Sequence, residues 1–213
     1  MTIDAVALGL VVAGGAWGVA ADRIGARWPA HEDGSIRPID WRTVVVVAAG
    51  AIALAGVSVT GGDLVARLVF GAYAVALVLL LATDLDQRLL PDIVTLPAIP
   101  IALAFDLAGL NPLVPVSDLP FTLLVTIAIP AVFFLLSIPF GEGAIGIGDL
   151  KLLLSAGLLA GGARIVSGVA WGAFVAGITI AVLLVARRVT LRTYIPFGPF
   201  LIAGALWAIL GVR

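Results

Sequence analysis

Apolar residues run along most of this chain in long blocks, and short polar segments separate the blocks. A transmembrane helix needs roughly 20 consecutive apolar residues, within a range of about 17–25. Seven blocks reach or approach that length: 5–21, 43–59, 64–82, 93–110, 119–140, 165–186 and 194–212. A further block, 150–162, is shorter and ends at Gly161-Gly162. The pattern predicts an all-α fold, a polytopic transmembrane helix bundle of about eight spans.

Composition agrees with a membrane protein. The 213 residues are 62% hydrophobic and only 12% charged, whereas a soluble domain carries about 25% charged residues. We therefore expect the lipid bilayer to be the partner of most of the surface. The net charge of −1 and the absence of any basic run argue against nucleic-acid binding.

The basic residues predict an orientation, because cytoplasmic loops of membrane proteins are enriched in Lys and Arg. With eight spans and the N-terminus outside, nine of the twelve basic residues lie on one face: Arg23, Arg27, Arg37, Arg42, Arg88, Lys151, Arg187, Arg188 and Arg192. The other three are Arg67, Arg164 and Arg213. If 150–162 does not cross, the division falls to seven against five, so the eight-span arrangement is preferred. It predicts a multi-pass protein of the inner (plasma) membrane.

The organisation along the chain is that of one integral membrane domain over 1–213. The longest polar segment, 22–42, is expected to be a cytoplasmic loop without a core of its own. The 25 glycines and the many alanines lie largely within the apolar blocks. Small residues let helix backbones approach closely in a membrane, so we expect a compact bundle.

Two acidic patches lie at the ends of apolar blocks, where ionisable groups are expensive and therefore carry a functional expectation. The first runs from Asp84 through Asp86 to Pro91-Asp92, and the second is Gly146-Ile-Gly148-Asp149-Leu-Lys151. Both patches fall on the predicted cytoplasmic face. If the bundle brings Asp84 and Asp149 together, one carboxylate can act as a general base and the other as a general acid on water.

Local sequence predicts how the two patches begin their helices. Pro91 suits the first turn of a helix, because its missing N–H loses no helical partner there. Asp149 should open the helix of the second patch, where the helix dipole and backbone N–H groups favour a carboxylate. The glycine-containing segment before Asp149 lacks the Gly-Lys-Ser/Thr ending of a phosphate loop, so nucleotide binding is not predicted.

At these residues the chain resembles the type IV prepilin peptidases, in a short form. The first motif of that family, an Asp followed by Leu/Ile-Pro-Asp/Asn, stands here as Asp84 to Asp92. The second, Gly-x-Gly-Asp-x-Lys-Leu, runs from Gly146 to Leu152, and the third, Pro-Phe-Gly-Pro-Phe, from Pro196 to Phe200. The three motifs occur in the order of the family, and the resemblance covers 64–212.

The resemblance implies a membrane aspartic endopeptidase with Asp84 and Asp149 as its catalytic residues. Its substrate would be a prepilin or pseudopilin precursor, cut on the cytoplasmic side between a short basic leader and an apolar helix. The remaining motif residues would support the site: Asp86, Pro91, Asp92, Gly146, Gly148, Lys151, Pro196 and Gly198. No metal and no cofactor is expected.

Long members of the family also bind zinc through four cysteines and methylate the new N-terminus with S-adenosylmethionine. This chain has no cysteine and a single histidine. Without the cysteines that zinc site cannot form, and the short 22–42 loop argues against methyltransferase activity.

Two other readings stay open at this stage. A small proton-coupled transporter could use the same aspartates as proton carriers, and it predicts mid-membrane carboxylates and internal repeats. Asp106, inside the block 93–110, could then be a relay group, although its place near Asn111 favours a packed polar role. A non-catalytic membrane scaffold is the third reading.

Overall fold

The computed structural model describes residues 5–141, 145–190 and 196–211, and these ranges hold eight α-helices and two short 3₁₀ turns. The helices are α1 (Ala5–Gly25), α2 (Trp41–Val57), α3 (Leu64–Gln87), α4 (Asp92–Leu107), α5 (Leu119–Ser137), α6 (Ile147–Ala160), α7 (Gly162–Val185) and α8 (Gly198–Leu210). The turns are η1 (Val116–Asp118) and η2 (Ile138–Phe140). Each predicted apolar block forms a helix, and the all-α membrane fold is confirmed.

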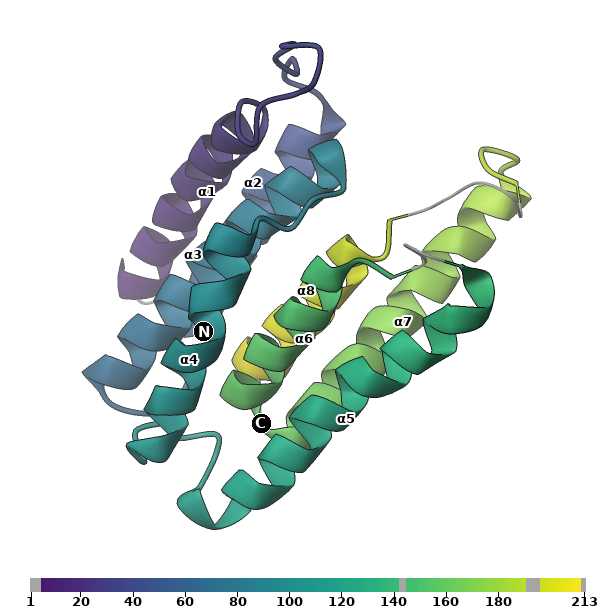
Figure 1. Ribbon diagram of the computed structural model, residues 1–213. Helices are drawn as coiled ribbons and strands as arrows, with labels where there is room; N and C mark the ends of the chain where they lie inside the picture. The colour runs from purple at the N-terminus through teal and green to yellow at the C-terminus, as the bar shows by residue number, and fades with distance from the viewer. Residues whose placement is uncertain (1–4, 142–144, 191–195, 212–213) are drawn as a thin grey trace.

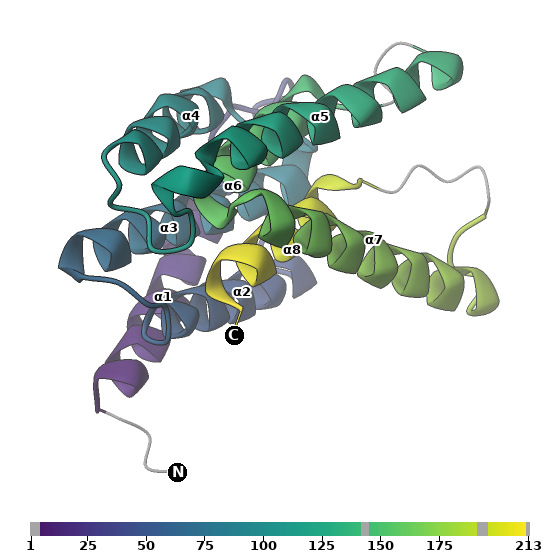
Figure 2. The same ribbon diagram turned by 90° about the horizontal axis from the view of Figure 1, so that it is seen from below.

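The helices form two groups with a shorter pair between them (Figures 1 and 2). Helices α1 to α4 lie on one side, and α5 and α7 on the other. The shorter α6 and α8 lie between the groups, where α6 packs on α4 and α5 while α8 packs on α3 and α7. The core follows the same arrangement, since its largest fully buried side chains include Phe70 and Leu77 of α3, Leu152 and Leu159 of α6, and Ile202 of α8.

Four segments are long and apolar enough to cross a membrane: α1, α3, α7, and η1 continuing into α5. Helices α2 and α8 are apolar but shorter. Helix α6 has 14 residues, about 21 Å at 1.5 Å per residue, which is less than the roughly 30 Å of a bilayer core. The full count of eight crossings stays a prediction.

Close backbone contacts hold the first two helices together, as the abundance of small residues predicts. A Cβ atom on Gly50 of α2 would overlap the carbonyl oxygen of Gly14 in α1, and a Cβ on Gly18 would overlap the backbone of Val47. Gly168 of α7 and Gly204 of α8 make an equivalent crossing. Such crossings are possible only where no side chain separates the two backbones.

Two helix ends differ from the predicted blocks in ways that affect the site. Helix α3 was expected to end near Asp84 and continues three residues further to Gln87, so Asp84 lies in its last turns. Helix α5 ends at Ser137, and the chain tightens into η2 around Pro139, because proline has no N–H to continue the helical ladder. The start of α4 agrees closely with its prediction, with Pro91 as N-cap and Asp92 in the first turn.

Candidate active site

Asp84 lies just before the end of α3, and its side chain is largely enclosed. The residue is 5% exposed. The helix ends because Arg88 adopts a left-handed conformation, with φ of 58°, and its N–H donates to the carbonyl oxygen of Asp84 at 2.9 Å. Among the described residues, no hydrogen-bond partner meets Oδ2 of Asp84. A buried carboxylate oxygen left in this state is available to water or substrate.

Asp149 is held in the first turn of α6, as the sequence predicts. Its N–H donates to the carbonyl oxygen of Gly146 at 3.0 Å. A Cβ on Gly146 would lie 3.2 Å from Oδ2 of Asp149, so the glycine leaves room for this carboxylate. The side chain is partly buried, and the positive end of the helix dipole favours its ionised form.

The two aspartates line one pocket, of about 300 Å³. Their negative charges are close enough to repel each other, while the guanidinium of Arg88 attracts Asp84. A Cβ on Gly148 would lie 2.8 Å from Cβ of Leu90. The missing side chain at Gly148 therefore lets the α3–α4 connection pack on the start of α6, which brings the two acidic patches together.

The rim of this pocket carries an ion pair. The Lys151 ammonium lies 2.6 Å from Oδ1 of Asp92 and joins α6 to the start of α4. The Asp92 side chain is 60% exposed, so the pair faces solvent more than core and contributes little to stability. The described residues that line the pocket are Asp84, Arg88, Leu89, Leu90, Asp92, Gly146, Ile147, Gly148, Asp149 and Lys151.

The third motif reaches the site through one backbone position. Gly198 is the first residue of α8 and is buried. A Cβ atom there would lie 2.6 Å from Oδ2 and 2.7 Å from Cγ of Asp84. The α8 backbone thus forms one wall against the Asp84 carboxylate. Pro196, two residues earlier, is half-buried and precedes the helix. Pro91 acts at the backbone as well, since its carbonyl oxygen accepts from the N–H of Val94 and Thr95.

Asp86 is the one acidic residue of the first patch that the structure does not bring to the pocket. Its side chain is 3% exposed and lies 2.8 Å from Nε of Arg37, 3.2 Å from Nη1 of Arg42 and 3.1 Å from Nε2 of His31. Arg37 also pairs with the fully buried Asp22. We call these residues (Asp22, His31, Arg37, Arg42 and Asp86) the loop clamp, because they fasten the α1–α2 connection to the end of α3.

The loop clamp changes the interpretation of the 22–42 segment. Helix α1 runs to Gly25 and α2 begins at Trp41, so the connection itself is shorter than the sequence suggests.

Burial alone lowers the pKa of Arg37, but the hydrogen bond from Arg37 to Asp22 and the carboxylates of Asp22, Asp40 and Asp86 outweigh it and raise that pKa above its usual value. Arg37 therefore stays charged at any pH near neutrality.

Two features of the site were not recognised in the sequence. Arg88 and Leu90 line the pocket, although the family motifs do not single them out. The loop clamp was missed as well. Asp84 and Asp86 are two positions apart on a helix and so face different directions, a signal that could have separated their roles.

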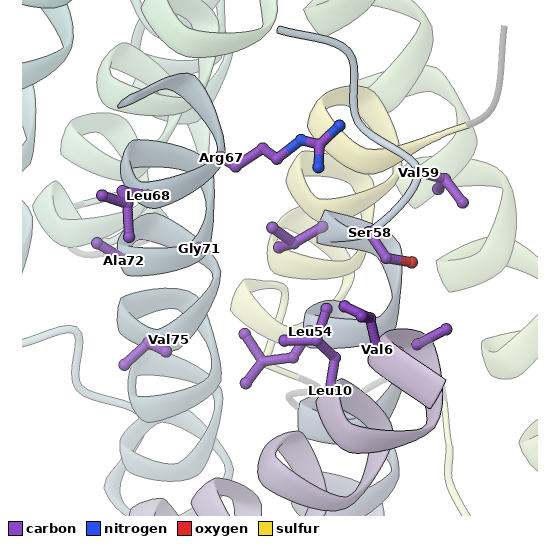
Figure 3. Close-up of a pocket in the computed structure, with 12 residues that line it drawn as sticks. Val6, Leu10, Leu54, Ser58, Val59, Arg67, Leu68, Gly71, Ala72 and Val75 are labelled. Atoms are coloured by element: carbon purple, nitrogen blue, oxygen red, sulfur yellow. The ribbon is translucent and has the colours of Figure 1, made fainter. Parts of the chain in front are cut away.

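Other polar groups lie away from the pocket. Asp106 is 1% exposed near the end of α4, where Nδ2 of Asn111 donates to its Oδ1 at 2.7 Å, as its expected packed role requires. A separate cavity, of about 820 Å³, lies among α1, α2 and α3 (Figure 3). It is lined mainly by apolar side chains with Arg67, and no carboxylate appears among its described lining residues.

The chemistry open to this pocket follows from its groups. Besides Asp92, which pairs with Lys151 at the rim, the side chains of Asp84, Asp149 and Arg88 line this small cavity. Within the described ranges, no three His, Cys, Asp or Glu side chains gather closely enough to hold a metal ion. Paired carboxylates of this kind are suited to proton transfer to and from a bound water molecule.

Fold and site together define a helical membrane protein in which Asp84 and Asp149 share one pocket near the ends of their helices. The chain belongs to the type IV leader peptidase family, whose model matches residues 71–187. The matched region includes Asp84 and Asp149 and stops before Gly198. The resemblance expected from the motifs is therefore confirmed, and the protein is a peptidase by family. Comparison with curated proteins and with solved structures gives no match.

Proposed function

We propose that this protein is an aspartic endopeptidase that removes the leader of prepilin-like precursors, with Asp84 and Asp149 as its catalytic residues. The observation that carries the proposal is the shared pocket of these two carboxylates, which are 65 residues apart in the chain and repel each other across it. Membership of the leader peptidase family gives the reaction class.

In the proposed reaction one aspartate is ionised and the other protonated. The ionised carboxylate takes a proton from water, and the water oxygen bonds to the carbonyl carbon of the scissile peptide. The protonated carboxyl gives its proton to the carbonyl oxygen. When the tetrahedral intermediate collapses, the C–N bond breaks, the leaving amine receives a proton from the first aspartate, and the second recovers its own.

The site is proposed to face the cytoplasm from the inner membrane. Asp84 and Asp149 lie at the same end of the bundle as the α1–α2 connection, with its Arg27, Arg37 and nearby Arg42. Basic residues are enriched on the cytoplasmic side. The transporter reading gains no support, because both carboxylates lie near helix ends. We propose no metal or cofactor for the reaction.

The test is cleavage of a prepilin-like precursor by the purified protein in lipid. Asp84→Asn and Asp149→Asn should each reduce cleavage by about a thousandfold or more, because neither amide can exchange the required proton. The matched control is Asp118→Asn, which removes an exposed carboxylate at the other end of the bundle. Undiminished cleavage by either site variant would refute the assignment of the pair.

A further inference from the structure

Helices α5 and α7 separate toward their C-terminal ends, and the described residues leave these ends largely uncovered. Figure 2 shows the two helices diverging on the side away from α1 to α4. No residue of Ala131–Ser137 in α5 or Gly177–Val185 in α7 is buried. Nearer the point of divergence, Ala128, Ile129, Val132, Phe133, Val166 and Val169 line an apolar cavity of about 210 Å³.

The helical repeat identifies which side chains continue this surface. Residues three or four positions apart lie on one face of a helix. On α7, the face that begins with Val166 and Val169 continues through Ala173, Gly177, Ile180 and Leu184. On α5, the face that begins with Ile129 and Val132 continues to Leu136. We call these positions the α5–α7 wedge. None of them is charged.

The α5–α7 wedge leads to the catalytic pocket through two aromatic rings. The Phe133 ring, which lines the apolar cavity, lies 6.2 Å from the ring of Phe197. Phe197 directly precedes Gly198, whose backbone lies against the Asp84 carboxylate. An apolar segment in the wedge would thus end beside the aspartates.

We propose that the α5–α7 wedge is the docking surface for the apolar helix that follows the scissile bond of the precursor. This inference rests on the proposed function. The surface is uncharged, as an apolar helix requires, and it is continuous with the site at which the bond must be cut. Ala173 and Gly177 allow close approach, since a Cβ on Gly177 would meet nothing within 4 Å and small residues favour helix contacts in membranes.

Single cysteines can test this contact cleanly, because the natural chain has none. The variant combines Ile180→Cys with Asp149→Asn, so that the bound precursor is not cut. A bismaleimide then links this variant to a precursor that has one cysteine in its apolar helix. Val182→Cys is the matched control, at the same depth of α7 but on the opposite face. We expect about tenfold more adduct from Ile180→Cys, because docking raises the effective concentration of the two thiols.

A second variant separates docking from catalysis. Gly177→Trp should fill the wedge and raise KM for the complete precursor by about tenfold. It should leave unchanged the cleavage of a soluble peptide that carries the scissile bond without the apolar helix. If the unaltered protein cuts neither substrate, the proposed function is wrong. Two outcomes would show that only the docking proposal is wrong and that lipid occupies the wedge. In the first, the unaltered protein cuts both substrates and Gly177→Trp cuts them with unchanged KM. In the second, Ile180→Cys and Val182→Cys form equal amounts of adduct.

Discussion

Gly198 and Asp84 stand in direct contact across the α3–α8 interface, with no space for a side chain between them. The ideal Cβ position at Gly198 is 2.6 Å from Oδ2 and 2.9 Å from Oδ1 of Asp84. Both residues are buried. A glycine 114 residues further along the chain therefore limits where one of the two proposed catalytic carboxylates can stand.

The first prediction concerns this contact. In Gly198→Ala the new methyl group must push the Asp84 carboxylate or the start of α8 away, because heavy atoms do not approach a Cβ within 3.0 Å. A displacement of roughly 1 Å in a catalytic group can cost about a hundredfold in rate, so we expect kcat for precursor cleavage to fall by about that factor.

The control for this substitution is Gly9→Ala in α1, where a Cβ would meet nothing within 4 Å. It should leave cleavage and thermal unfolding unchanged. Thermal unfolding of Gly198→Ala shows whether its loss of activity comes from the site or from the fold. Full activity in a normally folded Gly198→Ala protein would contradict the role given to this contact.

The relationship between Gly198 and Asp84 also marks the limit of sequence reasoning. Long apolar blocks predict helices because lipid forces the backbone to satisfy its own hydrogen bonds, and all eight helices were predicted. Local signals, such as Pro91 at the start of α4, predicted one boundary closely. The end of α3 was predicted near Asp84 and falls at Gln87, because the helix stops where Arg88 adopts the left-handed conformation that glycine normally supplies.

Tertiary contacts were less accessible. The sequence placed Asp84 and Asp149 on one membrane face, but their shared pocket depends on Gly148 fitting against Leu90, which no periodicity encodes. The loop clamp is similar. Arg37 lies 15 residues from Asp22 and further from Asp86, and only the packing of α1, α2 and α3 brings the three together.

The second prediction concerns the loop clamp. Arg37→Ala leaves two carboxylates without this partner, and the side chains of Asp22 and Asp86 are 0% and 3% exposed. Removing one member of a buried ion pair costs about 3–5 kcal/mol, so the free energy of unfolding, measured by denaturant titration in detergent, should fall by that amount.

The pH dependence of this loss follows from the sign of the pKa change. The pKa of Arg37 is raised in the folded protein, so its contribution to stability is complete below the unfolded pKa and is lost only above it, in strong alkali. Arg37 therefore does not titrate near neutrality, and its charge gives the loss of stability in Arg37→Ala no pH dependence there. Arg27→Ala, at an exposed position, should change stability little, and an equal loss there would refute a specific clamp.

The third prediction concerns the crossing of α1 and α2. A methyl group in Gly50→Ala would overlap the backbone of Gly14, so the helices must separate. Overpacking of this kind typically costs about 1–3 kcal/mol. Gly15→Ala is the control, since its Cβ would approach only a Val47 methyl group, at 4.0 Å. Thermal unfolding of the two variants measures the difference, and equal stability would show that the crossing is not tightly packed.

The last prediction separates the peptidase from a proton carrier. Asp106 is buried in α4, and in a transporter a buried carboxylate within a membrane span would mark a relay. It is the fifteenth residue of α4, roughly 21 Å along the helix from Asp92 at the rim of the pocket. Its Oδ1 accepts from Asn111, whose Nδ2 also donates to the carbonyl oxygen of Leu159 at 3.1 Å, so Asp106 joins α4 to the end of α6.

Asp106→Asn keeps an oxygen for the same hydrogen bond, and cleavage of the precursor should remain within about twofold. Asp106→Leu removes the acceptor and should lower stability by about 1–3 kcal/mol without a selective loss of kcat. A tenfold loss of kcat in a stable Asp106→Asn protein would instead place Asp106 on a proton path through the membrane.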